Sequence, residues 1–548
     1  LRGLTSRALA KTLPGEPADA CHTRLLTPVW TPAETPSGAG ETDRHVIYCA
    51  APDALGDSVA VEGRPGVSKL TTVAIKGAPA EAFGRAAAAV FEAIKAVLLE
   101  FADRARPRTP VTVQVVVHPS AAGYGLEGLS GLMRSARQEN TLLTTQLVLP
   151  AAPAEPAAIA DALDAEALSG FSGEVRLRAG GREVLEHQLL TASAAERPWR
   201  AAGVYLITGG LGGLGLRLAE DIAAHAAGAT LLLLGRSPPG NTVLARVDRL
   251  RAAGAAVEVV LLDVADGGQT DAAVRDLAAR HGPITGVIHC AGRASDNYLV
   301  NKPWSEFEQV LAPKTAGLLN LDLATRDQPL DFFVAFSSLA GAWGNAGQGD
   351  YAAANGFMDA HMARRTEAVA AGLAQGRSLS VNWPLWRDGG MRIDAAYETA
   401  MAARSGLVPL PTEDGLDALA AALATDHAQV LVAHGRLTAA PAAPAAPVER
   451  KPSRAPAAGP APAQAILLIR RMIADLVKAD PARIDIDAEL SEFGLDSISL
   501  TQLSNQLNER HGISLSPTIF FEYSTIREFA GHVGELYPEE ILAADADA

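Results

Sequence analysis

Residues 204–215 read VYLITGGLGGLG, an apolar run followed by a glycine-rich turn. The run predicts a buried strand, and the turn predicts the start of a helix. Two glycine spacings fit, T-G-x-x-x-G-x-G from Thr208 and G-x-G-x-x-G from Gly210. In either register the missing side chains let the backbone approach a pyrophosphate at a helix N-terminus, although a flexible turn is the alternative. The candidate dinucleotide contacts are Thr208, Gly209, Gly210, Leu211, Gly212, Gly213, Leu214 and Gly215.

Strand-like and helix-like runs alternate on both sides of this turn. After it, apolar runs lie at 231–234, 259–262, 286–289 and 332–336. Before it, an earlier set without a glycine loop has strand runs at 46–50, 111–118 and 142–149, and helical runs at 86–104 and 124–140. This alternation is typical of α/β folds with a mainly parallel sheet. We predict two Rossmann-like halves that meet near residues 195–203.

The composition excludes several classes of protein. The chain has 548 residues, 48% of them hydrophobic, and no run approaches the roughly 18 apolar residues of a membrane span. Its 47 basic and 62 acidic residues give a net charge of −15, which argues against a nucleic-acid partner. Cys21, Cys49 and Cys290 have neither metal-ligand nor disulfide-framework spacing, so we expect no metal and a cytoplasmic location. The chain starts at Leu1 without a signal peptide, and we interpret it as a piece of a longer protein.

A smaller unit follows a tether. Residues 438–464 alternate alanine and proline and predict a semi-extended linker. Residues 465–537 have apolar residues at helical spacing and predict an all-α domain of four helices, with a tail at 538–548. Residues 465–548 hold 15 acidic and 6 basic residues, so −9 of the net −15 lies there, and a basic partner surface would suit this unit.

The residue after the second strand of the later set indicates which dinucleotide binds. Arg236 stands about twenty residues beyond the glycines, where NAD-binding proteins keep an acid for the ribose hydroxyls. Arginine fits a 2′-phosphate instead, so we expect NADPH. Asp263 and Val264 follow the next strand and are candidates for the adenine edge; for Asp263 a helix cap is the alternative.

A serine and a tyrosine define the candidate chemistry. Ser338 ends the fifth strand and precedes Tyr351 by thirteen positions. A tyrosine protonates a carbonyl oxygen efficiently when a nearby cation brings its pKa toward neutrality. Short-chain dehydrogenases keep that cation as a lysine four residues after the tyrosine, where this chain has Asn355. Taken alone, the departure predicts an inactive enzyme.

Lys314, in the sequence VLAPKTAG, changes that conclusion. Here the chain resembles the ketoreductase domains of modular polyketide synthases, which exchange the lysine and asparagine positions and keep both groups in the site. The resemblance covers roughly 25–437, divided into a structural subdomain at 25–200 and a catalytic one at 201–437, with 1–24 as an upstream linker. It includes TPVW (27–30), GLSGLMRSARQE (128–139), HCAG (289–292) and NWPLW (382–386).

The resemblance implies a role for each site residue. Ser338 and Tyr351 would hold the substrate ketone, and Tyr351 would supply the proton. Lys314 would lower the pKa of Tyr351 and orient the ribose, and Asn355 would help to carry a water relay. Pro384 would flank the nicotinamide pocket. Residues 387–391 would begin a substrate lid, with a plain glycine loop as the alternative.

The C-terminal unit carries its own candidate site. FGLDSI places Ser497 at the start of a helix, where a serine is in isolation an ordinary N-cap. The whole unit, however, resembles an acyl carrier protein, whose serine in a G-x-D-S motif bears 4′-phosphopantetheine, and PTIFFEYSTI (517–526) matches the third-helix region of that family. A phosphate at a helix N-terminus is electrostatically favoured.

Together the two resemblances imply NADPH-dependent reduction of a carrier-bound β-ketoacyl thioester to the β-hydroxyacyl form. The implied partners are the acyl chain, a phosphopantetheinyl transferase, a ketosynthase and an acyltransferase, with a dehydratase as a further candidate. The spellings DNYL (296–299) and QGDYAAANGFMDA (348–360) resemble assembly lines that use separate acyltransferases. A catalytically silent scaffold and a free-standing dehydrogenase are the rival interpretations.

Two family markers disagree on the configuration of the alcohol. Asp296 falls where B-type ketoreductases, which form the D alcohol, keep the last acid of a Leu-Asp-Asp motif; the two preceding positions are Ala294 and Ser295. Trp343 matches the tryptophan of A-type enzymes, which form the L alcohol, with packing against the substrate groove as the alternative role of its ring. An acid on the loop beside the site can steer the pantetheine arm to one entrance, so we favour the D alcohol.

Overall fold

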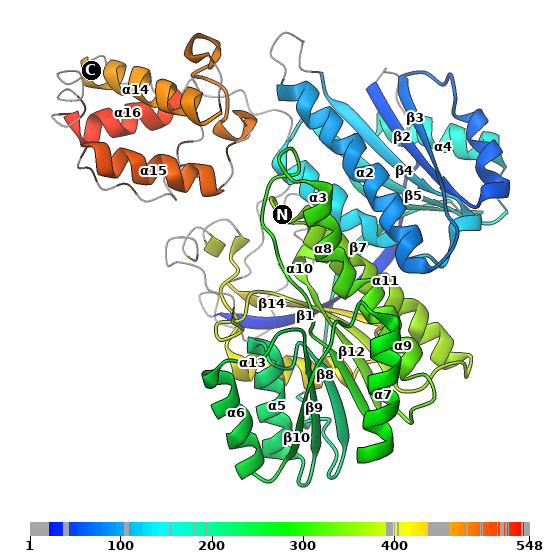
Figure 1. Ribbon diagram of the computed structural model, residues 1–548. Helices are drawn as coiled ribbons and strands as arrows, with labels where there is room; N and C mark the ends of the chain where they lie inside the picture. The colour runs from blue at the N-terminus through cyan, green and yellow to red at the C-terminus, as the bar shows by residue number, and fades with distance from the viewer. Residues whose placement is uncertain are drawn as a thin grey trace.

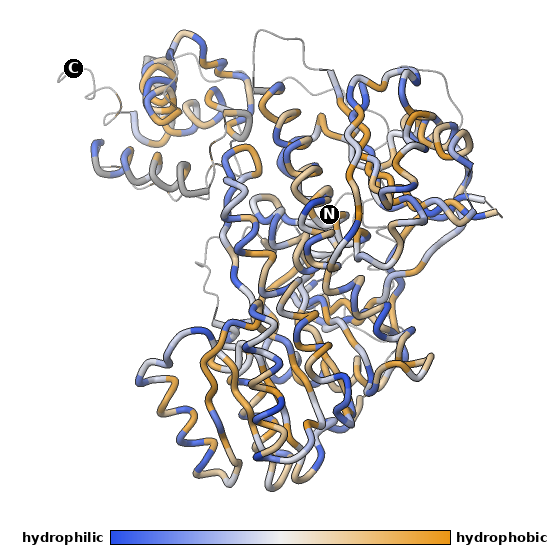
Figure 2. The backbone as a smooth tube through the Cα atoms, turned by 45° about the vertical axis from the view of Figure 1, so that its right-hand side comes forward, coloured by the Kyte–Doolittle hydropathy of each residue, from blue (hydrophilic) through white to orange (hydrophobic). Residues whose placement is uncertain are grey.

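The computed structural model describes residues 21–36, 43–102, 109–153, 155–179, 181–191, 194–390, 398, 401–402, 405–436 and 460–477, and residues 480–541 with gaps at 494, 496, 512, 514, 516–519, 521–522, 524 and 539–540. Figure 1 shows two α/β halves and a C-terminal helical unit. In Figure 2, hydrophobic residues follow the strands of the catalytic half and alternate with hydrophilic ones along its outer helices. This is the pattern of a buried parallel sheet covered by amphipathic helices.

The later half is a parallel sheet built from the apolar runs found in the sequence. Its strands are β8 (Val204–Thr208), β9 (Thr230–Gly235), β10 (Ala256–Leu261), β11 (Gly286–His289), β12 (Phe332–Ser338), β13 (Arg377–Trp383) and β14 (Gln429–Gly435). Its helices are α5 (Gly213–His225), α6 (Asn241–Ala252), α7 (Gly267–His281), α8 (Trp304–Lys314), α9 (Ala316–Ala324), α10 (Leu339–Trp343), α11 (Gly349–Ala370) and α13 (Thr412–Leu423). The strand order β10-β9-β8-β11-β12-β13-β14 reverses direction beside β8, so that the carboxyl ends of β8 and β11 lie at a topological switch point.

The earlier half has the same layout without a glycine loop. Its strands are β2 (Asp43–Ala50), β3 (Val67–Ala74), β4 (Val111–Val117), β5 (Leu143–Pro150), β6 (Gly173–Arg178) and β7 (Gly181–Leu190), of which β7 is antiparallel to β6. Its helices are α2 (Pro79–Ala102), α3 (Leu129–Glu139) and α4 (Pro156–Leu168), with 3-10 turns η1 (Pro52–Ala60), η2 (Pro119–Ala121) and η3 (Leu126–Gly128). The prediction of two Rossmann-like halves is confirmed.

The sequence did not show that the halves share one sheet. β1 (His22–Ala33) pairs antiparallel with β14 on one side and with β7 on the other, and so joins all 14 strands (Figure 1). The strand begins at His22, inside the segment expected to be an upstream linker (1–24). Its partner β14 is the last strand of the catalytic half along the sequence, about 400 residues away. The periodicity of a strand does not show which distant strand it pairs with.

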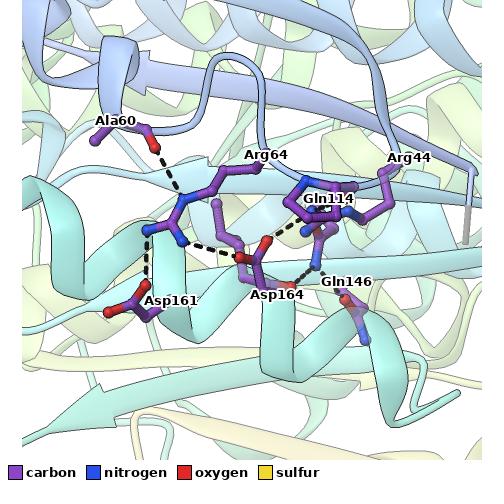
Figure 3. A network of polar contacts seen from close by, with 9 residues as sticks. Arg44, Ala60, Arg64, Gln114, Gln146, Asp161 and Asp164 are labelled. Carbon is purple, nitrogen blue, oxygen red and sulfur yellow. Dashed lines mark hydrogen bonds and ion pairs between the residues drawn. The ribbon is translucent and has the colours of Figure 1, made fainter. Parts of the chain in front are cut away.

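A polar network holds the outer layer of the structural half (Figure 3). Arg44, buried at the start of β2, donates to Asp164 on α4 at 2.6 Å, and Arg64 donates to the other oxygen of Asp164 at 3.3 Å. Beneath them Gln114 donates to Gln146 at 2.8 Å across β4 and β5. Arg44, Gln114 and Gln146 are buried and Asp164 is partly buried, and because these groups bond to one another the network stabilises α4 on the sheet.

Glycines let the two halves touch backbone to backbone. A Cβ added at Gly128 would lie 2.4 Å from the amide nitrogen of Phe357, and one at Gly131 would lie 2.6 Å from the carbonyl oxygen of Ala352. Both glycines belong to the 128–139 motif, and both contacts fall on α11, the helix that carries Tyr351. The structural half therefore supports the catalytic helix directly.

The C-terminal unit has a hydrophobic core of its own. Its helices are α14 (Pro460–Leu476), α15 (Ser497–His511) and α16 (Ile526–Leu536), with 3-10 turns at η4 (Pro481–Arg483) and η5 (Leu490–Phe493). Two expected boundaries move: α14 begins within the predicted linker 438–464, and Ile541 of the predicted tail is buried in this core. Most of 517–526, expected to be the third helix, lies outside the described residues. Within the described ranges, none of the helices combines the length and apolarity of a membrane span.

Candidate functional site

The glycine turn joins β8 to α5 as the sequence predicts. Gly209 has φ of 64°, a left-handed conformation that favours glycine, and Gly212 precedes the first turn of α5. A Cβ on Gly213 would lie 2.3 Å from the carbonyl oxygen of Gly389, and one on Gly215 would lie 2.4 Å from that of Gly209. Side chains at these positions would collide with backbone, so the turn is an open cradle of the kind that fits a pyrophosphate.

His289 contacts Thr208 at the start of the glycine turn, although the sequence indicated this histidine only as part of the HCAG family motif. The Thr208 hydroxyl and Nδ1 of His289 are 2.8 Å apart, which ties the end of β8 to the end of β11. Burial lowers the pKa of His289 to about 3, so the ring is neutral. The histidine of HCAG therefore positions the strand ends.

The candidate contacts to the adenosine end of the cofactor follow strands β9 and β10. Arg236 follows the end of β9 and is exposed, and a Cβ on the preceding Gly235 would touch the side chain of Leu211 in the glycine turn. Asp263 follows β10, and its carboxylate accepts from the amide of Ala265 at 3.0 Å. Asp263 therefore closes a local turn and does not cap a helix: the N-cap of α7 is Asp266, whose carboxylate accepts from the Gln269 amide. Val264, the residue after Asp263, is buried.

The four candidate catalytic residues come from three elements. Ser338 is the last residue of β12 and caps α10, its hydroxyl accepting from the amide of Ala340 at 3.2 Å. Tyr351 and Asn355 lie one turn apart on α11, where the Asn355 amide group donates to the Tyr351 carbonyl at 2.7 Å. Lys314 is the last residue of α8. The fold brings all four together.

The lysine from α8 provides the cation. Its ammonium nitrogen lies 5.5 Å from the centroid of the Tyr351 ring and donates to the Phe336 carbonyl at 3.0 Å. The side chain is almost fully buried, and burial lowers the pKa of Lys314 to about 8, against the opposing effects of Cys290 and Asp359. At neutral pH the lysine is therefore mostly charged.

The pKa of Tyr351 differs from the expectation. Burial raises the pKa of its hydroxyl, hydrogen bonds with the side chains of Asn355 and Ser338 lower it, and the charge of Asp296 raises it. The net direction is upward. The expected fall toward neutrality is not found, because burial outweighs the two hydrogen bonds.

Two buried polar groups lie near the tyrosine, and the sequence indicated a role only for the first. Among the described residues, none hydrogen-bonds to the buried Oδ1 of Asn355, which leaves an acceptor for the water relay that the resemblance implies. Asp359, one turn further along α11, accepts from Ser380 at 2.5 Å and from Asn382 of the NWPLW motif at 2.7 Å. Burial raises the pKa of Asp359 to about 6, and the charge of Lys314 lowers it. Asp359 lies in the QGDYAAANGFMDA spelling and its partner Asn382 in NWPLW, but nothing in the sequence indicated that the two side chains meet.

The segment after β13 lies against the glycine turn. Pro384 follows β13 directly, and Gly389 contacts Gly213 through its backbone. Of the expected lid, residues 387–390 belong to the described part of the chain, and Met391 lies outside it.

The two stereochemical markers occupy different environments. Asp296 is exposed on the loop after β11, and its carboxylate accepts from the Gln348 side chain at 3.0 and 3.1 Å. Trp343 is buried with Leu26 of β1, and its ring stands edge-on to that of His187, with centroids 6.2 Å apart. The tryptophan therefore packs where the two halves meet.

The candidate attachment residue begins a helix, as the sequence predicts. Ser497 is the first residue of α15, and Leu495, just before it, is part of the buried core. Ser497 is thus at the positive end of a helix dipole.

Fold and site together define an oxidoreductase of the short-chain dehydrogenase type. Comparison with known families supports this: residues 203–388 match the KR domain, and residues 468–533 match the phosphopantetheine attachment site. The crystal structure of a ketoreductase domain from the bacillaene assembly line superposes with a TM-score of 0.71 at 33% identity, over 76% of this chain and 98% of that one. The chain belongs to the ketoreductases of polyketide synthases and carries a carrier domain.

The curated relatives are much longer than this chain. Polyketide synthase PksN of Bacillus subtilis is 33% identical over 98% of the chain, and polyketide synthase ThaG of Burkholderia thailandensis is 38% identical over 93%. The chain spans 10% of PksN and 9% of ThaG. The part that this chain spans contains one KR domain and one phosphopantetheine attachment site.

Proposed function

We propose that this chain reduces a β-ketoacyl thioester, carried on its own C-terminal domain, to the β-hydroxyacyl thioester with NADPH. The observation that supports this most directly is the buried ammonium of Lys314, 5.5 Å from the Tyr351 ring centroid. Lys314, on α8, supplies the positive charge that short-chain dehydrogenases take from a lysine four residues after the tyrosine, where this chain has Asn355. The same observation speaks against a silent scaffold, which would have no reason to keep a buried charge in this place.

Each side chain has a defined task in this mechanism. The hydroxyls of Ser338 and Tyr351 are hydrogen-bond neighbours, and in this mechanism both would donate to the substrate ketone oxygen. Tyr351 then passes its proton to that oxygen, and Lys314 stabilises the phenolate that remains. The free Oδ1 of Asn355 accepts from a water that can return a proton to Tyr351.

The residues present fit NADPH. The cradle at Gly213 and Gly215 leaves backbone room for a pyrophosphate, and exposed Arg236 stands beside it, where it can pair with a 2′-phosphate. When bound, NADPH supplies the hydride. A free-standing dehydrogenase would also fit this half of the chain, but it would not need the carrier domain.

The carrier domain accounts for the remaining partners. A phosphopantetheinyl transferase would attach 4′-phosphopantetheine at Ser497, and a cytoplasmic ketosynthase, acyltransferase and dehydratase of the same assembly line would share the chain it carries. The DNYL and QGDYAAAN spellings resemble assembly lines with separate acyltransferases, and on this basis we propose that the chain comes from such an assembly line. The similarity to PksN and to the bacillaene ketoreductase is consistent with this proposal.

The environments of the two markers favour the D alcohol. Trp343 packs in the core, which accounts for its presence without a stereochemical role, whereas Asp296 is exposed on the loop beside the site. Chiral chromatography of the alcohol formed by wild type and by Asp296→Ala tests this assignment. A predominantly L alcohol from the wild type would overturn it.

Mass spectrometry of the loaded carrier tests the whole proposal. Phosphopantetheinyl transferase and a β-ketoacyl-coenzyme A should load the chain at Ser497 but should not load Ser497→Ala. NADPH should then add two hydrogens to the acyl group. Tyr351→Phe should load normally and lose reduction about a hundredfold or more, the usual cost of a missing general acid. A loaded wild type that is not reduced would favour the silent scaffold.

A further inference from the structure

Two loops meet beside the site. The substrate loop (residues 293–302) carries Asp296, and the catalytic loop (residues 344–350, which include the first two residues of α11) leads into Tyr351. The amide of Asn297 donates to the Gly347 carbonyl at 2.8 Å, and the Gln348 side chain donates to Asp296. The position of one loop therefore depends on the other.

Lys302 bridges the two loops from within. Its ammonium group, fully buried, donates at 2.5 Å both to the Asp350 carboxylate and to the Ser295 carbonyl. Ser295 immediately precedes Asp296, and Asp350 immediately precedes Tyr351. Asp350 also accepts from the Tyr351 amide at 2.8 Å. The ammonium group of Lys302 thus connects the residue before Asp296 to the residue before Tyr351.

Glu139 bridges the same loops from the structural half. One carboxylate oxygen accepts from the Leu299 amide at 2.8 Å and the other from the Gly347 amide at 3.0 Å. Burial raises the pKa of Glu139 to about 7 and also raises the pKa of Asp350. Lys302 forms a buried ion pair with Asp350, and its charge lowers the pKa of Glu139, so all three groups belong to one electrostatic cluster.

The rest of the 128–139 motif serves the same region. On α3, Arg134 donates to the Ala342 carbonyl and Gln138 to the Trp343 carbonyl at 2.8 Å, while the Ser135 hydroxyl accepts from the Asn345 amide at 3.0 Å. The polar face of α3 therefore follows the backbone from α10 into the catalytic loop. These contacts indicate that the 128–139 motif positions the backbone of the catalytic loop, a role separate from nucleotide binding.

We propose that Glu139, Lys302 and Asp350 are positioning residues that lock the substrate loop to the catalytic loop and thereby set how the acyl chain meets Tyr351. The inference rests on the proposed ketoreduction, and it names the residues that would determine the orientation of the substrate in that reaction. Removing the lock should displace Asp296 relative to Tyr351. Substrate affinity and the D to L ratio of the alcohol should therefore change, while NADPH binding, which depends on the glycine turn and Arg236, should not.

Lys302→Met tests the lock in the full chain. A simple β-ketoacyl thioester and NADPH give KM, kcat and the alcohol ratio, and NADPH fluorescence gives the cofactor Kd. We expect KM to rise about tenfold or more, as misplacements of the order of 1 Å can do. The alcohol ratio should move toward equality, and the NADPH Kd should stay within about twofold.

Two further variants separate the lock from general stability. Lys302→Met/Asp350→Asn removes both charges, and it should recover the denaturation midpoint without recovering the alcohol ratio, because nothing then bridges to Ser295. Arg182→Met breaks a buried ion pair to Glu166 within the structural half and should leave KM and the ratio unchanged. A lower kcat at unchanged KM and ratio, or an equal effect in Arg182→Met, would overturn the proposal.

Hydrogen–deuterium exchange reads the lock without catalysis. Peptides covering 293–302 and 344–350 should exchange about tenfold faster or more in Lys302→Met and should match wild type in Arg182→Met. Unchanged exchange would refute the lock. If the wild type forms no alcohol, ketoreduction fails as the function, and this exchange result still decides whether the lock exists.

Discussion

Lys314→Met tests how the site makes a buried tyrosine a usable acid and base. With an effective dielectric constant of about 20, a unit charge 5.5 Å from the ring stabilises the phenolate by about 3 kcal/mol. This corresponds to about two pKa units. Burial already raises the pKa of Tyr351, so removal of the ammonium should raise it further. The phenolate favours the charged lysine by the same amount, so the two groups titrate as a pair.

The oxidation direction reports the phenolate, because Tyr351 then acts as the base. At pH 7, where Lys314 is charged, we expect oxidation of a β-hydroxyacyl thioester by NADP⁺ to slow by about a hundredfold in Lys314→Met, because the fraction of Tyr351 present as phenolate falls by that factor. Lys69→Met, which removes an exposed cation from strand β3, is the matched control and should leave this rate unchanged. NADPH fluorescence checks that the variant still binds cofactor. A rate that falls by less than about threefold at pH 7 would show that Lys314 does not control the tyrosine.

Three further predictions concern the cofactor, the fold and its pH dependence. Arg236→Ala should weaken NADPH far more than NADH, and equal weakening in titrations would remove the 2′-phosphate role. Gly131→Ala, with its Cβ 2.6 Å from the Ala352 carbonyl oxygen, should lower the free energy of unfolding by about 1–3 kcal/mol in urea, whereas Gly56→Ala, with open space around it, should not reproduce that loss. The folded-state pKa of Lys314, about 8, lies below its ordinary 10.5, so its burial costs about 3 kcal/mol below pH 8 and progressively less as the pH rises to 10.5. Lys314→Met should therefore be at least as stable as wild type at pH 7, with a relative stability that declines above pH 8; a difference independent of pH would contradict this.

The sequence by itself determined the parts that depend on local chemistry. A glycine turn between an apolar run and a helix is visible in a dozen residues, because only missing side chains admit the backbone contacts seen at Gly213 and Gly215. The spacing of Ser338 and Tyr351 follows from one strand, one short helix and the start of α11. The match to Lys314 came from resemblance, since that residue lies on another helix and nothing local links it to the tyrosine.

Tertiary structure alone decided how these parts are held together. The pairing of β1 with β14 and β7 joins strands that are distant in the chain, and strand alternation says nothing about the identity of a partner. Lys302 has the local sequence of a solvated lysine, yet it is fully buried, because its two partners come from separate loops. Trp343 carries a family marker but packs between the halves. A buried charge or ring takes its role from neighbours that only the folded chain brings within reach.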